Sequence, residues 1–224
     1  KPGIDIVRAL ADAGLFDGVD AALGAHPSTS EAYCPTVEGS GNALACRTVR
    51  VAFHGKPAHA AADPYNGVNA LNAVIEVFNG INALRQHIKT DARIHGIIEK
   101  GGDAANIVPK YASVLMEVRS PDRKYHAELC EKVLNCARAA AKGAGARLEI
   151  SHYEEFFDVL LTNRTLARTH DGLILALGVD HVEPARTEGF ASSDSANISQ
   201  RCPLIQPTFK FTDVLPSPIT HSQE

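Results

Sequence analysis

The sequence has 224 residues, of which 45% are hydrophobic and 21% are charged, so it can bury a core and does not belong to the disordered class. Its formal net charge of -4 argues against a nucleic-acid partner, which would need a basic patch. No apolar run approaches the roughly 20 residues of a membrane span, so we expect no membrane partner.

The first predicted elements are a helix and a strand that precedes His26. Apolar residues recur at helical spacing over 4–15, and Gly14 is a suitable stop for that helix. The apolar residues between Val19 and Leu23 then suit a buried strand that ends just before His26. Because open α/β sheets bind ligands at the carboxyl ends of their strands, His26 is a candidate site residue.

A regular pattern begins at residue 47. The periodicity predicts a strand, a helix, two strands, a helix and a strand, over residues 47–55, 67–84, 93–99, 111–119, 124–143 and 147–153. This β-α-β-β-α-β order is the ferredoxin-like plan, with four antiparallel strands and two helices on one face. The first of these strands alternates and is also a candidate edge strand, which would need charge or a partner.

The pattern changes after about residue 156. We expect a helix over 163–178, a loop of small residues over 188–199, and extended chain over 203–211 that Pro207 breaks. The predicted organisation is a partial, discontinuous α/β domain with an inserted ferredoxin-like α+β domain; the first comprises residues 1–46 and 156–224, and the second residues 47–155.

The five cysteines include no C-x-x-C pair. Their odd number and their spacing signal neither a disulfide framework nor a zinc knuckle. We therefore expect reduced, mostly buried thiols and a cytoplasmic protein.

Several motifs carry candidate catalytic or ligand-binding residues. His59 lies among alanines in HGKPAHAAADP, which leaves it unobstructed, but its spacing from His54 does not suit a helical metal pair. An Asn such as Asn106 can donate to a carbonyl oxygen, and Arg119 can clamp a carboxylate at two points. Taken alone, a histidine such as His26 is more often a hydrogen-bonded structural residue than a ligand, and His221 is uninformative.

Together these motifs resemble the aminoacylase, carboxypeptidase G and succinyl-diaminopimelate desuccinylase family of zinc amidohydrolases. The resemblance rests on the G-x-x-A-H-A-A-x-P-like run from Gly55 to Pro64, on ANIVP followed by RSPD, and on S-x-D-x-x-N-x-S from Ser192 to Ser199. The segment DAGLFDGVDAALGAHP is similar to the aminobenzoyl-glutamate hydrolase and β-alanyl-dipeptidase branch.

The resemblance implies an α/β catalytic domain with a ferredoxin-like dimerisation (lid) domain, and two zinc ions per active site, with manganese or cobalt as alternatives. It implies a homodimer in which His59 stabilises the oxyanion in the partner subunit. The other implied roles are zinc ligands (His26 and His221), groups that bind the substrate carboxylate or carbonyl (Asn106 and Arg119), and residues that line the pocket (Asp194 and Asn197).

The implied activity is metal-dependent cleavage of N-acyl amino acids or dipeptide-like amides, small substrates that bear a carboxylate. The family's other metal ligands and its general-base Glu lie upstream of the GLFDGVD segment, where this sequence has no counterpart. We therefore expect a C-terminal fragment that is inactive alone. The alternative is a catalytically inactive homologue that acts as a dimerisation or ligand-binding module.

Overall fold

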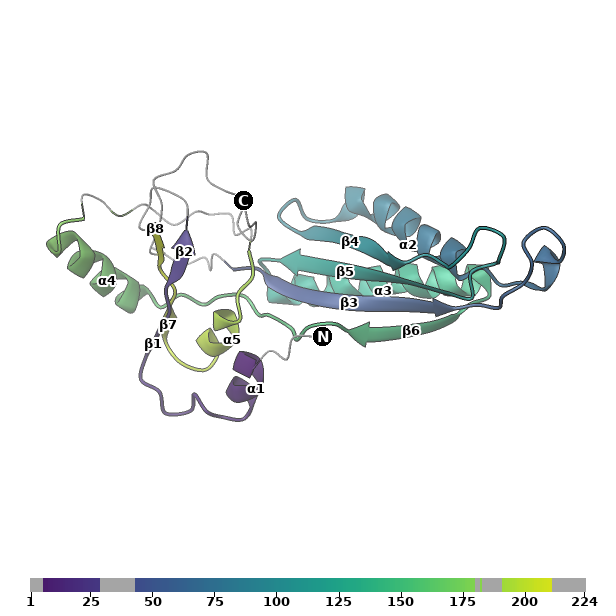
Figure 1. Cartoon of the computed structure of the whole chain (residues 1–224). Coiled ribbons are helices and arrows are strands. Elements are labelled where there is room, and N and C mark those ends of the chain that lie inside the picture. Colours follow the sequence, from purple (N-terminus) through teal and green to yellow (C-terminus); the bar gives the residue numbers. More distant parts are fainter. Residues whose placement is uncertain (1–5, 29–42, 180–181, 183–190, 211–224) are drawn as a thin grey trace. The chain divides into compact units, whose positions relative to one another are not determined.

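The computed structural model describes residues 6–28, 43–179, 182 and 191–210 (Figure 1). The chain divides into two compact units. Unit 1 contains Ala45–Phe156, and unit 2 contains the described parts of Asp5–Leu44 and Phe157–Glu224. Within the described ranges, no helix has both the length and the apolar character that crossing a membrane requires.

Unit 1 has the predicted order of helices and strands. Its elements are β3 (Ala45–His54), α2 (Ala70–Leu84), β4 (Arg93–Lys100), β5 (Tyr111–Ser120), α3 (Arg123–Ala144) and β6 (Arg147–His152), with short 3-10 turns η1 (Pro64–Asn66) and η2 (Arg85–His87). The strands form one sheet in the order β4-β5-β3-β6, in which all neighbours are antiparallel (Figure 1).

The prediction that the first strand of this sheet could be an edge is wrong. β3 lies inside the sheet, because β5 pairs with it along one side and β6 along the other. The edges are β4 and β6. Strand order depends on contacts between distant segments, so the alternation within β3 could not reveal it.

Side-chain caps fix where the two helices of unit 1 begin. The Asn69 side chain accepts hydrogen bonds from the backbone N–H groups of Leu71 and Asn72, so α2 begins three residues later than the apolar pattern predicted. Asp122 caps α3 in the same way. Gly145 ends α3 with φ at 68°, a left-handed conformation that suits glycine.

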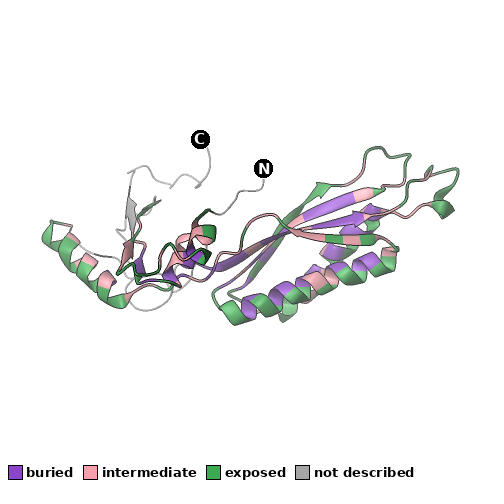
Figure 2. Ribbon diagram, turned by 90° about the horizontal axis from the view of Figure 1, so that it is seen from below, coloured by how far each residue is buried: buried purple, intermediate pink, exposed green. Residues whose placement is uncertain are grey.

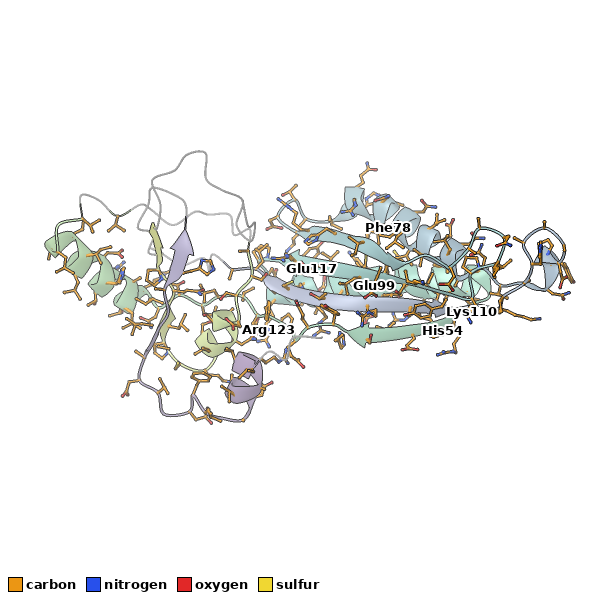
Figure 3. All side chains as sticks on the ribbon, viewed as in Figure 1. His54, Phe78, Glu99, Lys110, Glu117 and Arg123 are labelled. Carbon is orange, nitrogen blue, oxygen red and sulfur yellow. The ribbon has the colours of Figure 1, made fainter. Side chains whose placement is uncertain are left out.

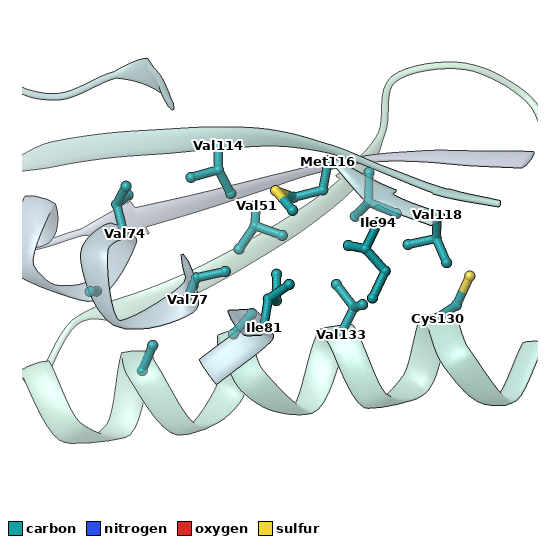
Figure 4. Close-up of a cluster of buried hydrophobic side chains, with 14 of the residues drawn as sticks. Val51, Val74, Val77, Ile81, Ile94, Val114, Met116, Val118, Cys130 and Val133 are labelled. Atoms are coloured by element: carbon teal, nitrogen blue, oxygen red, sulfur yellow. The ribbon is translucent and has the colours of Figure 1, made fainter. Parts of the chain in front are cut away.

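The core of unit 1 lies between the sheet and the two helices. Figure 4 shows Val51 of β3 and Met116 of β5 among the side chains that α2 and α3 cover, and the buried stripes of both helices face the same core (Figure 2). The buried face of α2 consists of Ala70, Ala73, Val74, Val77 and Ile81.

Side chains that alternate with the core residues lie on the other side of the sheet, which α2 and α3 do not cover. We call this side the open face. It carries charged and polar residues of all four strands, including Arg50, His54, His95, Glu99, Ser113, Glu117, Arg119 and Glu149.

A network on the open face spans the sheet. Glu99 is an extra residue in the β4–β5 pairing, and this bulge brings its carboxylate to Arg50 of β3. Arg50 donates from Nε at 2.8 Å and from Nη2 at 2.6 Å, and Ser113 of β5 donates to the same carboxylate at 3.0 Å. The Arg50 guanidinium also lies 5.0 Å from the ring centroid of Tyr153. The network therefore links β3, β4 and β5 and extends to Tyr153, the residue after β6.

Unit 2 contains short elements. They are α1 (Ile6–Asp12), β1 (Ala22–Leu23), β2 (His26–Ser28), α4 (Arg164–Ala176), α5 (Ser195–Ser199), β7 (Leu204–Ile205) and β8 (Thr208–Lys210). β1 pairs with β7 and β2 with β8, both in parallel.

Two predictions for unit 2 are wrong. The strand expected up to Leu23 is not buried, because Val19 is 37% exposed and Leu23 is 70% exposed. The segment expected to be a loop of small residues contains helix α5. Pro207 does interrupt the extended chain between β7 and β8, and Gly14 follows α1 with φ at 78°, as a helix stop should.

The cysteines that the structure describes form no disulfide. Cys46, Cys130 and Cys202 are buried and Cys136 is partly buried; Cys34 lies outside the described residues. Burial raises the pKa of the Cys130 thiol to about 11, so this thiol stays protonated at neutral pH.

Two isoleucines of α2 test the position of the core. Ile81 is completely buried, whereas Ile75 is 45% exposed. Ile81→Ala should lower the free energy of unfolding by about 2–5 kcal/mol, because it removes buried methyl groups and leaves a cavity. Ile75→Ala should change it by about 1 kcal/mol or less. Urea unfolding of both variants measures the difference, and equal losses would contradict the assigned core.

Candidate functional site

Two loops meet at the end of β3 and the start of β5. The Gly55 N–H donates to the Lys110 carbonyl at 2.8 Å, and the Val108 N–H donates to the Ala58 carbonyl at 2.9 Å. Beyond these bonds, the Ala60 N–H donates to the Asn106 carbonyl at 3.0 Å. The loops therefore bring His59 and Asn106 together, although the sequence separates them by the whole of α2 and β4.

His59 is exposed, and its own loop orients its ring. Its Nδ1 accepts hydrogen bonds from the N–H groups of Ala61 at 3.3 Å and Ala62 at 3.1 Å. Because Nδ1 is an acceptor, the neutral ring carries its proton on Nε2. An imidazole held this way can donate from Nε2 to an oxygen that develops negative charge. The backbone of Asn106 lies beside this loop, and its side-chain amide is also able to donate a hydrogen bond.

Two glycines allow the loops to pack closely. A Cβ on Gly55 would lie 2.0 Å from the Val68 carbonyl oxygen, and a Cβ on Gly67 would lie 3.0 Å from Val108 Cγ2. The loop that carries His59 thus returns along the start of α2 with no room for a side chain at Gly55.

Arg119 lies far from this pair. It is near the end of β5, whereas Asn106 precedes the start of that strand. A strand of ten residues is about 30 Å long at about 3.3 Å per residue. The structure therefore does not bring Asn106 and Arg119 of one chain together, and a single small substrate could meet both only if they came from different chains.

The Arg119 guanidinium is held by a neighbouring carboxylate. Its Nε and Nη2 donate to Oε2 of Glu117 at 3.1 and 2.6 Å. Burial would lower the pKa of Arg119, but the hydrogen bond to Glu117 and the nearby carboxylates outweigh burial and raise it. Arg119 is therefore a permanent cation. Figure 3 labels Glu117 on the sheet.

Sequence reasoning missed Glu117 and its neighbour His95. His95 of β4 stands directly opposite Glu117, and its Nε2 lies 3.5 Å from the same Oε2. One signal was present in the sequence: Glu117 precedes Arg119 by two residues on a predicted strand, so both must lie on the same face.

The predicted site residues of unit 2 have different surroundings. His26 is exposed and begins β2, where its N–H donates to the Pro207 carbonyl at 2.9 Å, so it does not end the strand predicted before it. The Asn197 side chain is 7% exposed, and its Oδ1 accepts from the Asp158 N–H at 2.9 Å. Asp194 is half-buried just before α5. Their functional roles stay predictions.

The metal site also stays a prediction. His221 lies outside the described residues. Within the part of the chain that the structure describes, no group of three or more His, Cys, Asp or Glu side chains could hold a metal ion. His26 is the one predicted ligand inside the described ranges, and an exposed imidazole is chemically suited to zinc.

Comparison with known proteins indicates the class of protein to which the chain belongs. Residues 46–144 match the family model of the peptidase dimerisation domain. The chain is 36% identical to the Xaa-Arg dipeptidase of Mus musculus, over 92% of this chain and 47% of that protein. It is 35% identical to one of the subunits of the p-aminobenzoyl-glutamate hydrolase of Escherichia coli K12, over 68% of this chain and 31% of that one.

The fold of the chain is similar to that of a solved structure. An aminobenzoyl-glutamate utilization protein from Klebsiella pneumoniae superposes with a TM-score of 0.74 at 22% identity, over 90% of this chain and 53% of that one. The chain belongs to the aminoacylase, carboxypeptidase G and succinyl-diaminopimelate desuccinylase family, in the branch of the aminobenzoyl-glutamate hydrolases and β-alanyl dipeptidases. It spans about half the length of the Xaa-Arg dipeptidase that it matches.

The two-loop arrangement can be tested with a pair of glycines. Gly55→Ala should lower the free energy of unfolding by about 1–3 kcal/mol, because the new Cβ overpacks the loop against the backbone. Hydrogen exchange at the Ala60 amide should become faster as its bond to Asn106 weakens.

Gly143→Ala is the matched control. A Cβ there meets nothing within 4 Å, and alanine favours the helix, so this variant should gain up to about 1 kcal/mol. Unchanged Ala60 exchange in Gly55→Ala would contradict the loop pairing.

Proposed function

We propose that this chain is part of a metal-dependent amidohydrolase that cleaves dipeptides or N-acyl amino acids next to a free carboxylate. The observation that carries the proposal is the 36% identity to an Xaa-Arg dipeptidase over 92% of this chain. An exposed imidazole, an amide and a guanidinium on the same unit are the groups that such a reaction needs for its oxyanion and its carboxylate.

We propose that residues 47–155 form the inserted ferredoxin-like dimerisation (lid) domain. Its antiparallel sheet with two helices on one face supports this assignment. Residues 1–46 and 156–224 would belong to the catalytic domain, and the separation of the chain into two compact units supports that division.

The partner subunit would pair along β4. This strand is an edge of the sheet, and two adjacent isoleucines, Ile97 and Ile98, are 61% and 47% exposed. Because neighbouring residues of a strand point to opposite sides, a paired partner strand would cover apolar groups on both sides of the edge. A two-fold contact of this kind is the commonest way in which identical chains associate.

The active sites would then be shared. His59 and Asn106 lie together at one end of the sheet, and Arg119 lies at the other end, about 30 Å away. We propose that His59 and Asn106 of one chain serve the site that uses Arg119 of the other. The Arg119 fork would hold the substrate carboxylate, while the His59 Nε2–H and the Asn106 amide would donate to the oxygen of the scissile amide as it becomes negative.

His26 and His221 would hold the metal together with ligands from elsewhere in the enzyme. Zinc, or manganese or cobalt in its place, would supply Lewis-acid chemistry that polarises the amide carbonyl and activates water. His59 and Asn106 would add hydrogen bonds to the same developing charge.

Mixing two inactive variants of the full-length enzyme tests the shared site. In a mixed dimer of His59→Ala and Arg119→Ala, one site carries both lesions and the other carries neither. Random mixing gives about half mixed dimers, so about a quarter of wild-type activity should return. No recovery, with mixed dimers demonstrated, would mean that His59 acts in its own subunit.

A second mixture is the matched control. His59 and Asn106 come from the same end of one chain, so in a mixed dimer of His59→Ala and Asn106→Ala every site keeps one lesion. This mixture should recover no activity. Recovery here would contradict the assignment of both residues to the same donor chain.

Removal of metal tests the proposed chemistry. Dialysis of the full-length enzyme against a chelator should abolish hydrolysis of N-acyl amino acids and dipeptides, and added zinc should restore it. Metal analysis of the purified protein should find zinc in proportion to activity. A protein with neither metal nor hydrolysis would instead favour a dimerisation or ligand-binding module.

A further inference from the structure

An isoleucine stands next to His59 where the two loops pair. His59 and Ile107 form an isolated antiparallel β-bridge. The hydrogen bonds that flank this bridge are made by the neighbouring residues of each loop, so His59 and Ile107 are themselves a non-hydrogen-bonded pair. The Cα atoms of such a pair are about 4.5 Å apart, and both side chains project to the same side. The Ile107 side chain therefore lies beside the imidazole.

The opposite side of the paired loops is packed. A Cβ on Gly67 would lie 3.1 Å from the Ala58 Cβ and 3.0 Å from Val108 Cγ2, so the side chains of Ala58 and Val108 point toward Gly67. These two residues are the sequence neighbours of His59 and Ile107. Because consecutive side chains of an extended chain point to opposite sides, His59 and Ile107 point away from Gly67.

Ile107 is fixed in place but does not contribute to the core of unit 1. It is 46% exposed, and it is not a member of the cluster of apolar residues between the sheet and the two helices. Its own N–H donates to the Ala104 carbonyl at 3.2 Å. The backbone thus presents an apolar group to solvent at a defined position beside the imidazole.

The proposed reaction defines which part of a substrate would reach this group. His59 Nε2 would donate to the oxygen of the scissile carbonyl, and Arg119 of the other chain would hold the carboxylate of the amino acid that leaves. The remaining part of the substrate is the carbon chain of the acyl group, which is bonded to the same carbonyl carbon. Contact between that chain and Ile107 would remove apolar surface of both from water.

We propose that Ile107 is a specificity-determining residue that forms one wall of the subsite for the acyl group. The ligand of this subsite is an aliphatic carbon chain next to the scissile carbonyl. The inference rests on the proposed function, because it requires His59 to bind the carbonyl oxygen. It adds a contact to the carbon chain of the acyl group, for which His59 and Arg119 have no assigned role.

Substrate pairs that differ only in the acyl chain test this role. One pair is the N-butanoyl and N-acetyl derivatives of an amino acid, and the other is the dipeptides in which 2-aminobutyryl or glycyl precedes it. The amino acid is the one whose derivatives the wild-type full-length enzyme cleaves fastest. Wild type should prefer the longer member of each pair, with up to about a fourfold gain in kcat/KM for each methylene that becomes buried. Ile107→Ala should lower this preference about fivefold, because truncation removes most of the apolar wall.

Two further variants are controls. Ile75 of α2 is 45% exposed, so Ile75→Ala removes the same groups from an equally exposed position outside the loops and should leave both preferences unchanged. Ile107→Leu keeps the apolar volume and should keep each preference within about twofold. The ratio of two substrates on one enzyme does not depend on the fraction of folded protein, and sedimentation of each variant reports whether it still forms dimers.

The outcomes are distinct. A wild-type enzyme without preference for the longer acyl chain, or an unchanged preference in Ile107→Ala, overturns the role of Ile107 and leaves the proposed function standing. An equal loss of kcat/KM for both members of each pair, together with dissociation of the dimer, also overturns it, because Ile107 would then serve subunit contact. A wild-type enzyme that hydrolyses no N-acyl amino acid and no dipeptide overturns the proposed function, and the inference falls with it.

Discussion

The antiparallel ladder between β3 and β5 determines the layout of unit 1. The two strands pair without interruption from Ala45 opposite Ser120 to His54 opposite Tyr111. One end of this ladder opens into the loops that carry His59 and Asn106, and the other end carries Arg119. Because a paired strand cannot shorten, the ladder holds the two groups apart by its own length. Both strands lie inside the sheet, where β4 pairs along the outer side of β5 and β6 along the outer side of β3. The ladder is therefore paired on both sides.

Alternate side chains of each strand point to opposite sides of the sheet. One side therefore packs into the core, and the other carries charged residues. Along β5, Val114, Met116 and Val118 enter the core, and the residues between them face away from it. Those outward residues include Ser113, Glu117 and Arg119, which join the networks of the open face. The hydrophobic core and the candidate recognition surface are therefore the two sides of one strand, and a one-residue slip in register would exchange them.

The elements of unit 1 could be predicted from the sequence because periodicity and local chemistry agree there. The helix formed by residues 123–144 has its cap, apolar stripe and terminal glycine all in place. Strand order could not be predicted, because the pairing of β3 with both β5 and β6 depends on contacts far apart in the chain. The exposure of Leu23 was also missed, since an apolar run of this length does not reveal whether a partner covers it.

The candidate site was predictable in its residue types but not in its grouping. The motifs identified His59, Asn106 and Arg119 individually, and the resemblance gave Asn106 and Arg119 a common role in binding the substrate. The extended strand β5 instead separates these two residues by about 30 Å. His59 and Asn106, which are far apart in sequence, meet through backbone bonds that no side-chain pattern indicates. Glu117 escaped notice because an acidic residue on a strand usually faces solvent.

The two edges of the sheet are unlike each other, and this difference limits how copies of the chain can associate. β4 presents Ile97 and Ile98, whereas β6 presents Arg147 and Glu149, whose side chains are 65% and 54% exposed. If β4 of one copy paired with β6 of the next, each addition would leave a fresh edge and the chain would grow into a filament. Charged side chains along β6 oppose that contact. Pairing of β4 with another β4 uses up the apolar edge in both copies, so growth stops at two.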